Sequence, residues 1–391
     1  MTNNVTIQTK LLHNEHKVDP VTGAVSVPIQ HSSTFHQHSF EDFGEYDYAR
    51  GSNPTRKALE EVIAELEGGT RGFAFSSGMA AISTAFMLLS KGDHVVITED
   101  VYGGTYRFVT EVLPRFGIEH SFVDMTNTDE VIKHIKPTTK LIYIETPSNP
   151  TLKITDIREI VKIAKSHHCL TFCDNTFLTP IFQRPLDLGV DIVLHSATKF
   201  LGGHSDVVAG LAVVKDKDLG ARLAFLHNSF GAILGVQDSW LVLRGLKTLQ
   251  VRMEASSKAA ETIANWLNER EEISRVYYPG LNTHPGREVQ EQQSTSHGAV
   301  LSFEFSTREQ AKFFVENVNL PVFAVSLGAV ESILSYPATM SHGSMPKEER
   351  EKRGISDGLL RLSVGLENVD DLLNDFKQAL ELMELKKDKK V

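Results

Sequence analysis

The chain has 391 residues, of which 41% are hydrophobic and 23% are charged, a balance that is ordinary for soluble globular proteins. Its length predicts about two domains with a large core. A formal net charge of −10, with no basic patch apart from the lysine-rich C-terminal tail, argues against nucleic-acid binding. A polar N-terminus and the lack of a long apolar run argue against a signal peptide and a membrane span, so a cytoplasmic location is expected.

The first 45 residues or so have no strong periodicity, and we expect an extended arm that needs a partner surface. A loop with Gly, Asn and Pro follows, and then a helix over 56–67 that ends at a Gly-Gly pair. Tyr48 and Arg50 are separated by one residue in an extended stretch, so their side chains point the same way. They could contact an anion or could form an ordinary solvated pair.

Short apolar strands then alternate with helices. Strands are predicted over 72–75, 94–98, 140–145, 170–173, 191–195 and 208–214. Repeated strand-then-helix units predict a mainly parallel sheet with helices on both faces. Ligands of such sheets bind beyond the carboxyl ends of the strands, so the residues that follow each strand are candidates for a site.

Small and polar residues follow the earlier strands. Ser76, Gly78 and Met79 lie between a strand and a helix, where backbone N–H groups can cradle a phosphate. The segment lacks the dinucleotide and GxxxxGK[ST] patterns, which argues against NAD and nucleoside triphosphates. Tyr102 stands before two glycines and could lay its ring on a flat ligand. Asn149 also follows a strand.

Two charged residues follow the later strands. Asp174 closes an almost wholly apolar strand, where a buried carboxylate needs a cation or donors, although it could instead be a cap or turn residue. Lys199 follows a core strand closely, and desolvation there would lower its pKa toward that of a usable nucleophile. The alternative for Lys199 is a snorkelling side chain at a strand end. Ser196 and Thr198 could donate to a nearby anion.

The stretch from 167 to 173 contains His-His-Cys-Leu-Thr-Phe-Cys, which invites a metal site. In a strand, Cys169 and Cys173 would lie ~13 Å apart, too far for one tetrahedral ion. Two cysteines are also too few for a disulfide framework. Buried thiols in a core strand are therefore the better interpretation, and no metal ion is expected.

The rest of the chain is predicted to be α+β. One helical pattern runs from near Gln237 to Trp266, long enough to bridge two domains, and the boundary is expected at 248. Strands over 274–278, 299–305 and 359–364 and helices over 308–315 and 369–383 follow. Arg361 lies inside an apolar strand, where a guanidinium needs a carboxylate. That carboxylate could belong to Glu367 or to a substrate.

Pyridoxal phosphate, an aldehyde with a pyridine ring and a phosphate, would use all of these groups. Lys199 would hold it as a Schiff base, and Asp174 would keep the ring nitrogen protonated. Arg361 would fix the carboxylate of an amino acid. The residues alone therefore favour a pyridoxal-phosphate enzyme that acts on an amino acid.

Eight segments of the chain form a recognisable set. They span residues 48–50, 76–79, 101–105, 145–150, 174–176, 196–206, 326–328 and 360–363. Together they resemble the Cys/Met metabolism family of pyridoxal-phosphate enzymes, the trans-sulfuration enzymes, and the similarity covers nearly the whole chain.

The resemblance implies an α/β, aspartate-aminotransferase-like (type I) fold. A pyridoxal-phosphate-binding domain with a mainly parallel sheet would span 56–248, and a smaller α+β domain would span 249–391. Residues 1–55 would form an arm that contacts the neighbouring subunit. The implied assembly is a homotetramer, a dimer of dimers with shared active sites, in which Tyr48 and Arg50 reach the neighbour's cofactor phosphate.

The resemblance also implies roles for individual residues. Lys199 and Tyr102 would be catalytic. The implied cofactor-binding residues are Lys199, Asp174, Ser76, Gly78, Met79, Tyr102, Ser196, Thr198, Tyr48 and Arg50. The implied substrate-binding residues are Arg361, Ser326, Asn149, Glu331, Tyr48 and Arg107.

The implied reaction is cleavage of a carbon–sulfur bond. Lys199 would take the Cα proton, and Tyr102 would assist or protonate the leaving sulfur. The amino-acid sequence, including residues 332–342, is most similar to those of bacterial cystathionine β-lyases. These enzymes release homocysteine, pyruvate and ammonia from cystathionine in methionine biosynthesis.

Other members of the family are alternatives. Gly104 stands where methionine γ-lyases have a cysteine, which argues against that activity. Glu331 is shared with cystathionine γ-lyases and γ-synthases, where it binds the distal amine, so the γ-lyase is the second possibility and the γ-synthase the third. A silent, ligand-sensing relative would lack Lys199, Asp174 or Arg361, and all three are present.

Overall fold

The computed structural model describes residues 5–13 and 18–388. Its main sheet has the strand order β1-β7-β6-β5-β4-β2-β3. The strands from β6 to β3 are parallel, and β7 is antiparallel to both β6 and β1, which confirms the predicted mainly parallel sheet. The strands are β1 (Arg71–Phe75), β2 (His94–Thr98), β3 (Glu119–Val123), β4 (Thr139–Glu145), β5 (Leu170–Asp174), β6 (Ile192–Ser196) and β7 (Gly210–Val214).

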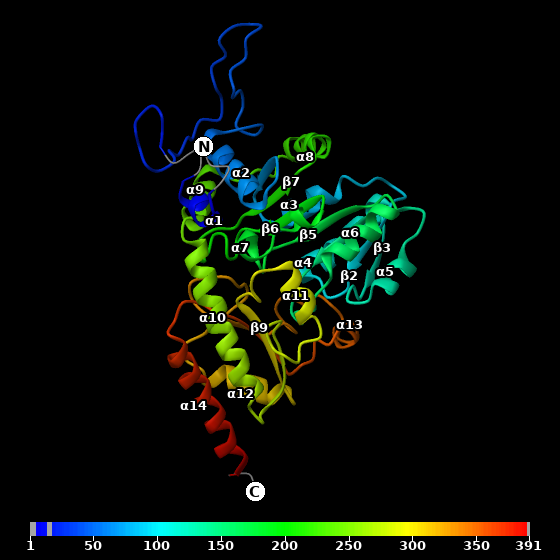
Figure 1. Cartoon of the computed structure of the whole chain (residues 1–391), viewed down its shortest axis with the longest axis vertical. Helices are drawn as coiled ribbons and strands as arrows, with labels where there is room; N and C mark the ends of the chain where they lie inside the picture. Colours follow the sequence, from blue (N-terminus) through cyan, green and yellow to red (C-terminus); the bar gives the residue numbers. More distant parts are fainter. Residues whose placement is uncertain (1–4, 14–17, 389–391) are drawn as a thin grey trace.

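Helices cover both faces of this sheet (Figure 1). Side chains alternate along each strand, so Ile142 and Ile144 of β4 enter one core while Leu141 and Tyr143 enter another. The first core includes residues of α2 (Pro54–Glu67) and α6 (Ile157–Ser166), and the second includes residues of α3 (Gly78–Phe86) and α8 (Lys217–Phe230). Because both faces are covered, every residue of β2 and β7 is buried.

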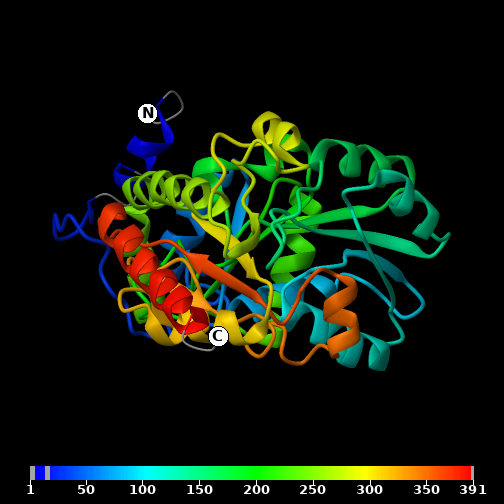
Figure 2. The same ribbon diagram turned by 90° about the horizontal axis from the view of Figure 1, so that it is seen from below.

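A second sheet, of order β10-β11-β12-β9-β8, forms the other half of the molecule (Figures 1 and 2). Its core contains Ile263, Phe303, Phe314 and Phe376, contributed by one strand and three helices. The helices are α10 (Leu249–Asn268), α12 (Arg308–Asn317) and α14 (Val369–Asp388). The strands are β8 (Ile273–Tyr277), β9 (Val300–Phe305), β10 (Val322–Phe323), β11 (Ile333–Ser335) and β12 (Leu359–Ser363).

The single long helix expected from 237 to 266 is wrong, because α9 (Val236–Leu246) ends before α10 begins. Gly245 packs closely against the loop that contains Gly202, because a Cβ added to Gly245 would lie 2.3 Å from the Gly202 carbonyl oxygen. At the break, the Gly245 carbonyl oxygen accepts hydrogen bonds from the N–H and hydroxyl of Thr248, both at 3.2 Å, and from Arg252 Nη2 at 2.8 Å. The break lies at residues 247–248, and the domain boundary expected there stays a prediction.

The N-terminal part is more structured than expected. A short helix, α1 (Ile7–Leu12), buries Leu11 against the first core. Beyond it the chain projects from the body (Figure 1), and Val21 and Phe40 are 89% and 96% exposed. The remaining helices of the described residues are α4 (Gly103–Arg107), α5 (Thr128–His134), α7 (Thr179–Phe182), α11 (Arg287–Gln293) and α13 (Lys347–Lys352), with a π-helical turn (Phe108–Val112) and two 3-10 turns (Leu113–Phe116 and Pro185–Leu188).

Within the described part of the chain, none of the helices is both long and apolar enough to cross a bilayer. Cys169 and Cys173 are both buried free thiols, and Cys169 lies just before β5 rather than inside it. No group of three or more His, Cys, Asp or Glu side chains among the described residues is placed to hold a metal ion.

Candidate active site

A cavity of about 440 Å³ lies between the carboxyl ends of the parallel strands and the second sheet. It brings together most of the site residues predicted from the sequence. These are Gly78, Met79, Tyr102, Arg107, Asn149, Asp174, Ser196, Thr198, Lys199, Ser326 and Arg361. The strand-end rule therefore located the site, since residues from five strand ends of the first sheet meet here.

Four predicted site residues lie outside this cavity. Ser76 is exposed and donates its N–H to the Ala232 carbonyl, and its neighbour Ser77 lines the cavity instead. Arg50 packs over the Tyr48 ring, 5.7 Å from its centroid. The exposed Glu331 lines an adjoining cavity of about 600 Å³, which shares Thr198 and Ser326 with the first.

The first turn of α3 forms a cradle for an anion. Ser77 caps the helix, and its hydroxyl accepts a hydrogen bond from the Ala80 N–H at 3.0 Å. Gly78 is packed against β6, because a Cβ added there would stand 2.9 Å from the Cβ of Ser196. Free N–H groups at a helix N-terminus beside the hydroxyls of Ser196 and Thr198 suit a phosphate group.

Asp174, the last residue of β5, is a buried carboxylate on the cavity wall. Its Oδ1 accepts hydrogen bonds from the N–H and the hydroxyl of Thr176, at 3.0 and 2.6 Å. Burial raises the pKa of Asp174, and the two Thr176 bonds oppose that rise. The carboxylate therefore organises its own turn and also faces the cavity, and its role in binding a ligand stays a prediction.

Lys199 and Ser326 meet across the two sheets. The Lys199 amine donates to the Ser326 hydroxyl at 2.6 Å. Burial, helped by the nearby charge of Arg361, lowers the pKa of Lys199 to about 8. An amine with this pKa is partly unprotonated at neutral pH and can act as a nucleophile or a base.

Arg361 of β12 has no carboxylate partner among the described residues. Its Nη1 donates to Asn149 Oδ1 at 2.8 Å and its Nη2 to the Ser326 carbonyl at 2.7 Å, while its buried Nε has no hydrogen-bond partner there. The proposed pairing with Glu367 is wrong, because that carboxylate accepts from the N–H and hydroxyl of Ser332 instead. The guanidinium is therefore open to the carboxylate of a ligand.

Glu145 is a cavity residue that our reading of the sequence did not single out. Its Oε2 accepts a hydrogen bond from the Tyr102 N–H at 3.0 Å. It is the register neighbour of Asp174 on the adjacent strand. Burial and the charge of Asp174 raise the pKa of Glu145 well above its usual range. Because Asp174 has two donors on one oxygen, we assign the proton to Glu145 and the negative charge to Asp174.

Several further lining residues come from loops. Thr176 lies two residues after Asp174 and could have been found from the Asp-Asn-Thr turn. Met340 and Ser341 reach the cavity from a loop of the second sheet. Only the folded chain brings them beside Tyr102.

The donor set fits pyridoxal phosphate. The cavity is lined by an anion cradle suited to the phosphate and by a buried carboxylate suited to the protonated ring nitrogen. It also contains a partly unprotonated lysine that suits the aldehyde. The guanidinium of Arg361, which has no carboxylate partner in the described part of the chain, lies at the side of the cavity formed by the second sheet. An amino-acid carboxylate would satisfy it there.

Known proteins with similar sequences and structures agree with this fit. The family model described as Cys/Met metabolism PLP-dependent enzyme matches residues 8–381. The chain is 71% identical to cystathionine beta-lyase MetC of Bacillus subtilis (strain 168), over 96% of this chain and 97% of that protein. It is 53% identical to a cystathionine gamma-lyase of the same organism, over 96% and 99% of the two chains.

A solved structure of a cystathionine gamma-lyase from Lactobacillus plantarum, complexed with L-serine, has the same fold. Its TM-score to this chain is 0.94 at 47% identity, and the match covers 96% of this chain and 99% of that one. The predicted fold class, cofactor and enzyme class are thereby confirmed. The chain belongs to the Cys/Met metabolism family of pyridoxal-phosphate-dependent enzymes.

Proposed function

We propose that this chain is a cystathionine β-lyase, which cleaves cystathionine to homocysteine, pyruvate and ammonia. The observation that carries the proposal is its 71% identity to the Bacillus subtilis β-lyase along nearly the whole length of both chains. The cavity described above supplies the groups that this reaction needs, since Lys199, Asp174 and Arg361 all line it.

Two sets of residues would hold the phosphate and the ring of the cofactor. Ser77, Gly78 and the hydroxyls of Ser196 and Thr198 would bind its phosphate, and Asp174 would pair with its ring nitrogen. When bound, pyridoxal phosphate supplies an electron sink for the pair that deprotonation leaves on Cα.

The side chains around it would carry the proton transfers. Arg361, held by Asn149, would bind the α-carboxylate and so fix the orientation of Cα. The Lys199 amine, oriented by the Ser326 hydroxyl, would accept the Cα proton. The Tyr102 phenol, at the cavity wall, would deliver a proton to the leaving sulfur.

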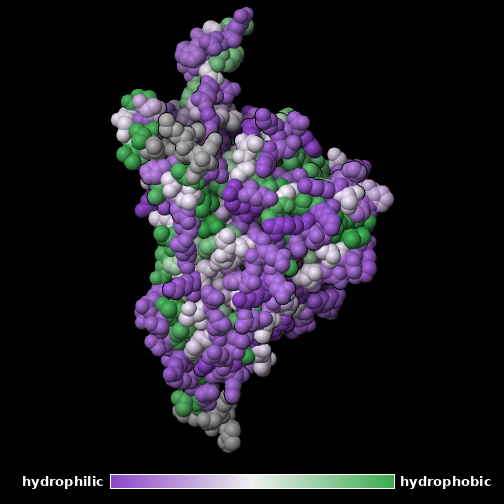
Figure 3. Space-filling model, viewed as in Figure 1, coloured by the Kyte–Doolittle hydropathy of each residue, from purple (hydrophilic) through white to green (hydrophobic). Residues whose placement is uncertain are grey.

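We further propose that the site is completed by a second subunit in a homotetramer, a dimer of dimers, in the cytoplasm. In Figure 3 the projecting N-terminal segment carries hydrophobic as well as hydrophilic side chains on its surface. Val21 and Phe40 are almost fully exposed there, which suits a surface covered by another chain. Tyr48 and Arg50 would then reach the neighbour's phosphate cradle, with 1–55 as the arm, 56–248 as the cofactor domain and 249–391 as the C-terminal domain.

The γ-lyase activity is the second candidate. It is supported by the 53% identity to a γ-lyase and by Glu331, whose carboxylate beside the active site could bind the distal ammonium of cystathionine. Incubation with cystathionine and identification of the products separates the two. Pyruvate with homocysteine is the expected result, whereas 2-oxobutyrate with cysteine would replace the β-lyase proposal by the γ-lyase.

A further inference from the structure

The turn that carries Tyr102 is held from two sides. Residues 99–102 join β2 to α4, and the last residue of β4 and the loop after it bind two of them. The buried carboxylate of Asp100 accepts hydrogen bonds from two hydroxyls in the 148–151 loop. The Tyr102 N–H donates to Glu145, as described above. All of these contacts lie within the first half of the molecule.

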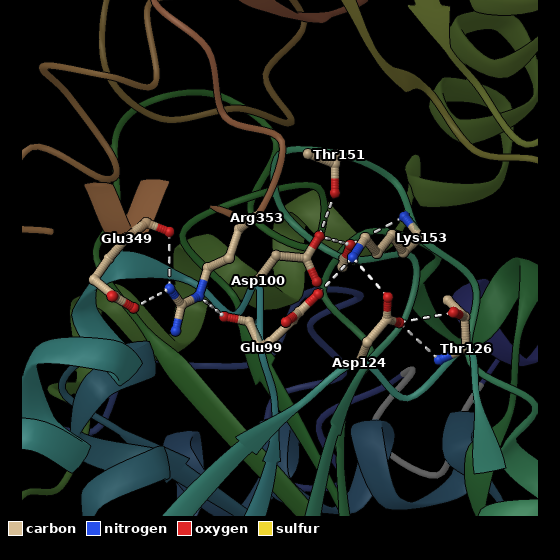
Figure 4. A network of polar contacts seen from close by, with 9 residues as sticks. Glu99, Asp100, Asp124, Thr126, Thr151, Lys153, Glu349 and Arg353 are labelled. Atoms are coloured by element: carbon tan, nitrogen blue, oxygen red, sulfur yellow. Dashed lines mark hydrogen bonds and ion pairs between the residues drawn. The ribbon is translucent and has the colours of Figure 1, made fainter. Parts of the chain in front are cut away.

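The second hold comes from the other half of the molecule. Residues 336–358 join β11 to β12, and they contact the carbonyls of the other two residues of the turn, Glu99 and Val101. Arg353 Nε donates to the Glu99 carbonyl at 2.8 Å, a contact that is visible in Figure 4. His342 Nε2 donates to the Val101 carbonyl at 3.3 Å. Each of four consecutive residues of the turn therefore has its own partner.

The contact between the two segments is close as well as polar. A Cβ added to Gly103 would lie 1.8 Å from the Ser341 carbonyl oxygen, so only a glycine allows this approach. The Arg353 guanidinium lies 5.7 and 5.5 Å from the ring centroids of Tyr106 and Phe122, and it is only 8% exposed. Arg353 therefore packs against the first sheet as well as bonding to it.

The same segment borders the place where a substrate would lie. Met340 lines the cavity, and the strand that follows the segment carries Arg361. We propose that Arg353 and His342 are positioning residues, which fix the Tyr102 turn relative to Arg361 and so set the phenol against the leaving sulfur. This inference rests on the proposed lyase function, and neither residue touches the reacting atoms.

The test compares two arginines that are equally buried at the same helix. Arg350 is also 8% exposed, but it bonds to Asp357 of its own segment, so Arg350→Gln is the matched control for Arg353→Gln. In the full-length holoenzyme without substrate, we expect amide hydrogen exchange over residues 100–106 to be at least ~10-fold faster in R353Q than in R350Q. With cystathionine, kcat of R353Q should fall about 10- to 100-fold while KM stays within about twofold, because Arg361 is untouched.

A second pair of variants guards against general unfolding of R353Q. His342→Phe keeps a planar ring and loses the donor to Val101, whereas His342→Gln keeps an N–H donor. We expect faster exchange over 100–106 in H342F and recovery in H342Q. Equal exchange in R353Q and R350Q, together with equal exchange in H342F and H342Q, would overturn the proposal. A wild-type protein that leaves cystathionine intact would instead refute the proposed function, and the exchange comparison would still decide the positioning role.

Discussion

The amine of Lys199 and the hydroxyl of Ser326 are 2.6 Å apart although they belong to different halves of the molecule. Ser326 has a φ of 90°, a left-handed conformation that is costly for a serine. The Arg361 guanidinium donates a hydrogen bond to the carbonyl of Ser326. The strained residue thus joins the lysine of the first sheet to the arginine of the second.

The Ser326 contact predicts the effect of Ser326→Ala. The variant removes the acceptor that orients the Lys199 amine, so we expect kcat with cystathionine to fall about tenfold. The thermal midpoint should move little, because the Arg361 bond goes to the Ser326 backbone and is kept. Steady-state kinetics beside a thermal melt would check this, and an unchanged kcat would show that the hydroxyl does not orient the amine.

Replacing Asn149 should weaken the binding of cystathionine. Its Oδ1 is one of two groups that hold the Arg361 guanidinium, and its side chain is buried. Asn149→Ala should therefore raise KM for cystathionine about tenfold, because a charge-assisted hydrogen bond contributes ~1.5–3 kcal/mol. The effect on kcat should be smaller. A variant with unchanged KM would mean that Arg361 does not bind the substrate carboxylate.

Replacing each of the two neighbouring carboxyl groups by its amide should change kcat/KM to very different extents. Glu145→Gln keeps an acceptor for the Tyr102 N–H and replaces a group that is already neutral, so kcat/KM should stay within about threefold. Asp174→Asn removes the charge that pairs with the ring nitrogen, so kcat/KM should fall at least ~100-fold. Kinetics and cofactor retention after dialysis measure both. A large fall in kcat/KM for Glu145→Gln with little change for Asp174→Asn would mean that the proton is on Asp174 and the charge on Glu145.

Stability should depend on pH through buried histidines. Burial lowers the folded-state pKa of several of them to about 4, below the ordinary value of about 6.5. As the pH falls from 6.5 to 4, the unfolded chain binds protons that the native state does not, so the free energy of unfolding decreases. The histidines concerned are His94, His227, His284 and His342.

A single variant isolates this effect. Buried carboxyls such as Glu60, whose burial raises its pKa to about 7, act in the opposite sense, so the wild-type slope alone is not decisive. His227→Gln keeps an N–H donor for the Ala74 carbonyl and removes one titrating group. Denaturant unfolding between pH 6 and 4.5 should show a slope flatter by about 1.4 kcal/mol per pH unit. Parallel wild-type and variant curves would contradict the assignment.

The sequence was sufficient to predict the groups at strand ends, because parallel strands bring their carboxyl ends to one edge. Tyr102, Asp174 and Lys199 were found in this way. Glu145, which ends its strand as Asp174 does, was missed because the predicted strand over 140–145 included it as an ordinary strand residue. Strand β3 was not predicted, since its residues Glu119–Val123 are largely polar and only partly buried.

Errors arose where tertiary contacts decided the outcome. Glu367 lies near Arg361 in sequence, but the arginine bonds to Asn149, more than 200 residues away. The break between α9 and α10 depends on Gly245 packing against a distant loop, which a helical pattern does not report. Local periodicity contains no information on either contact.

The central claim is that Lys199 carries the cofactor in the cavity between the two sheets. Borohydride reduction of the purified holoenzyme, followed by digestion and mass spectrometry, tests it most directly. We expect the phosphopyridoxyl group on the peptide that contains Lys199, together with loss of the absorbance near ~420 nm. A modified lysine elsewhere, or a protein that takes up no pyridoxal phosphate, would contradict the claim.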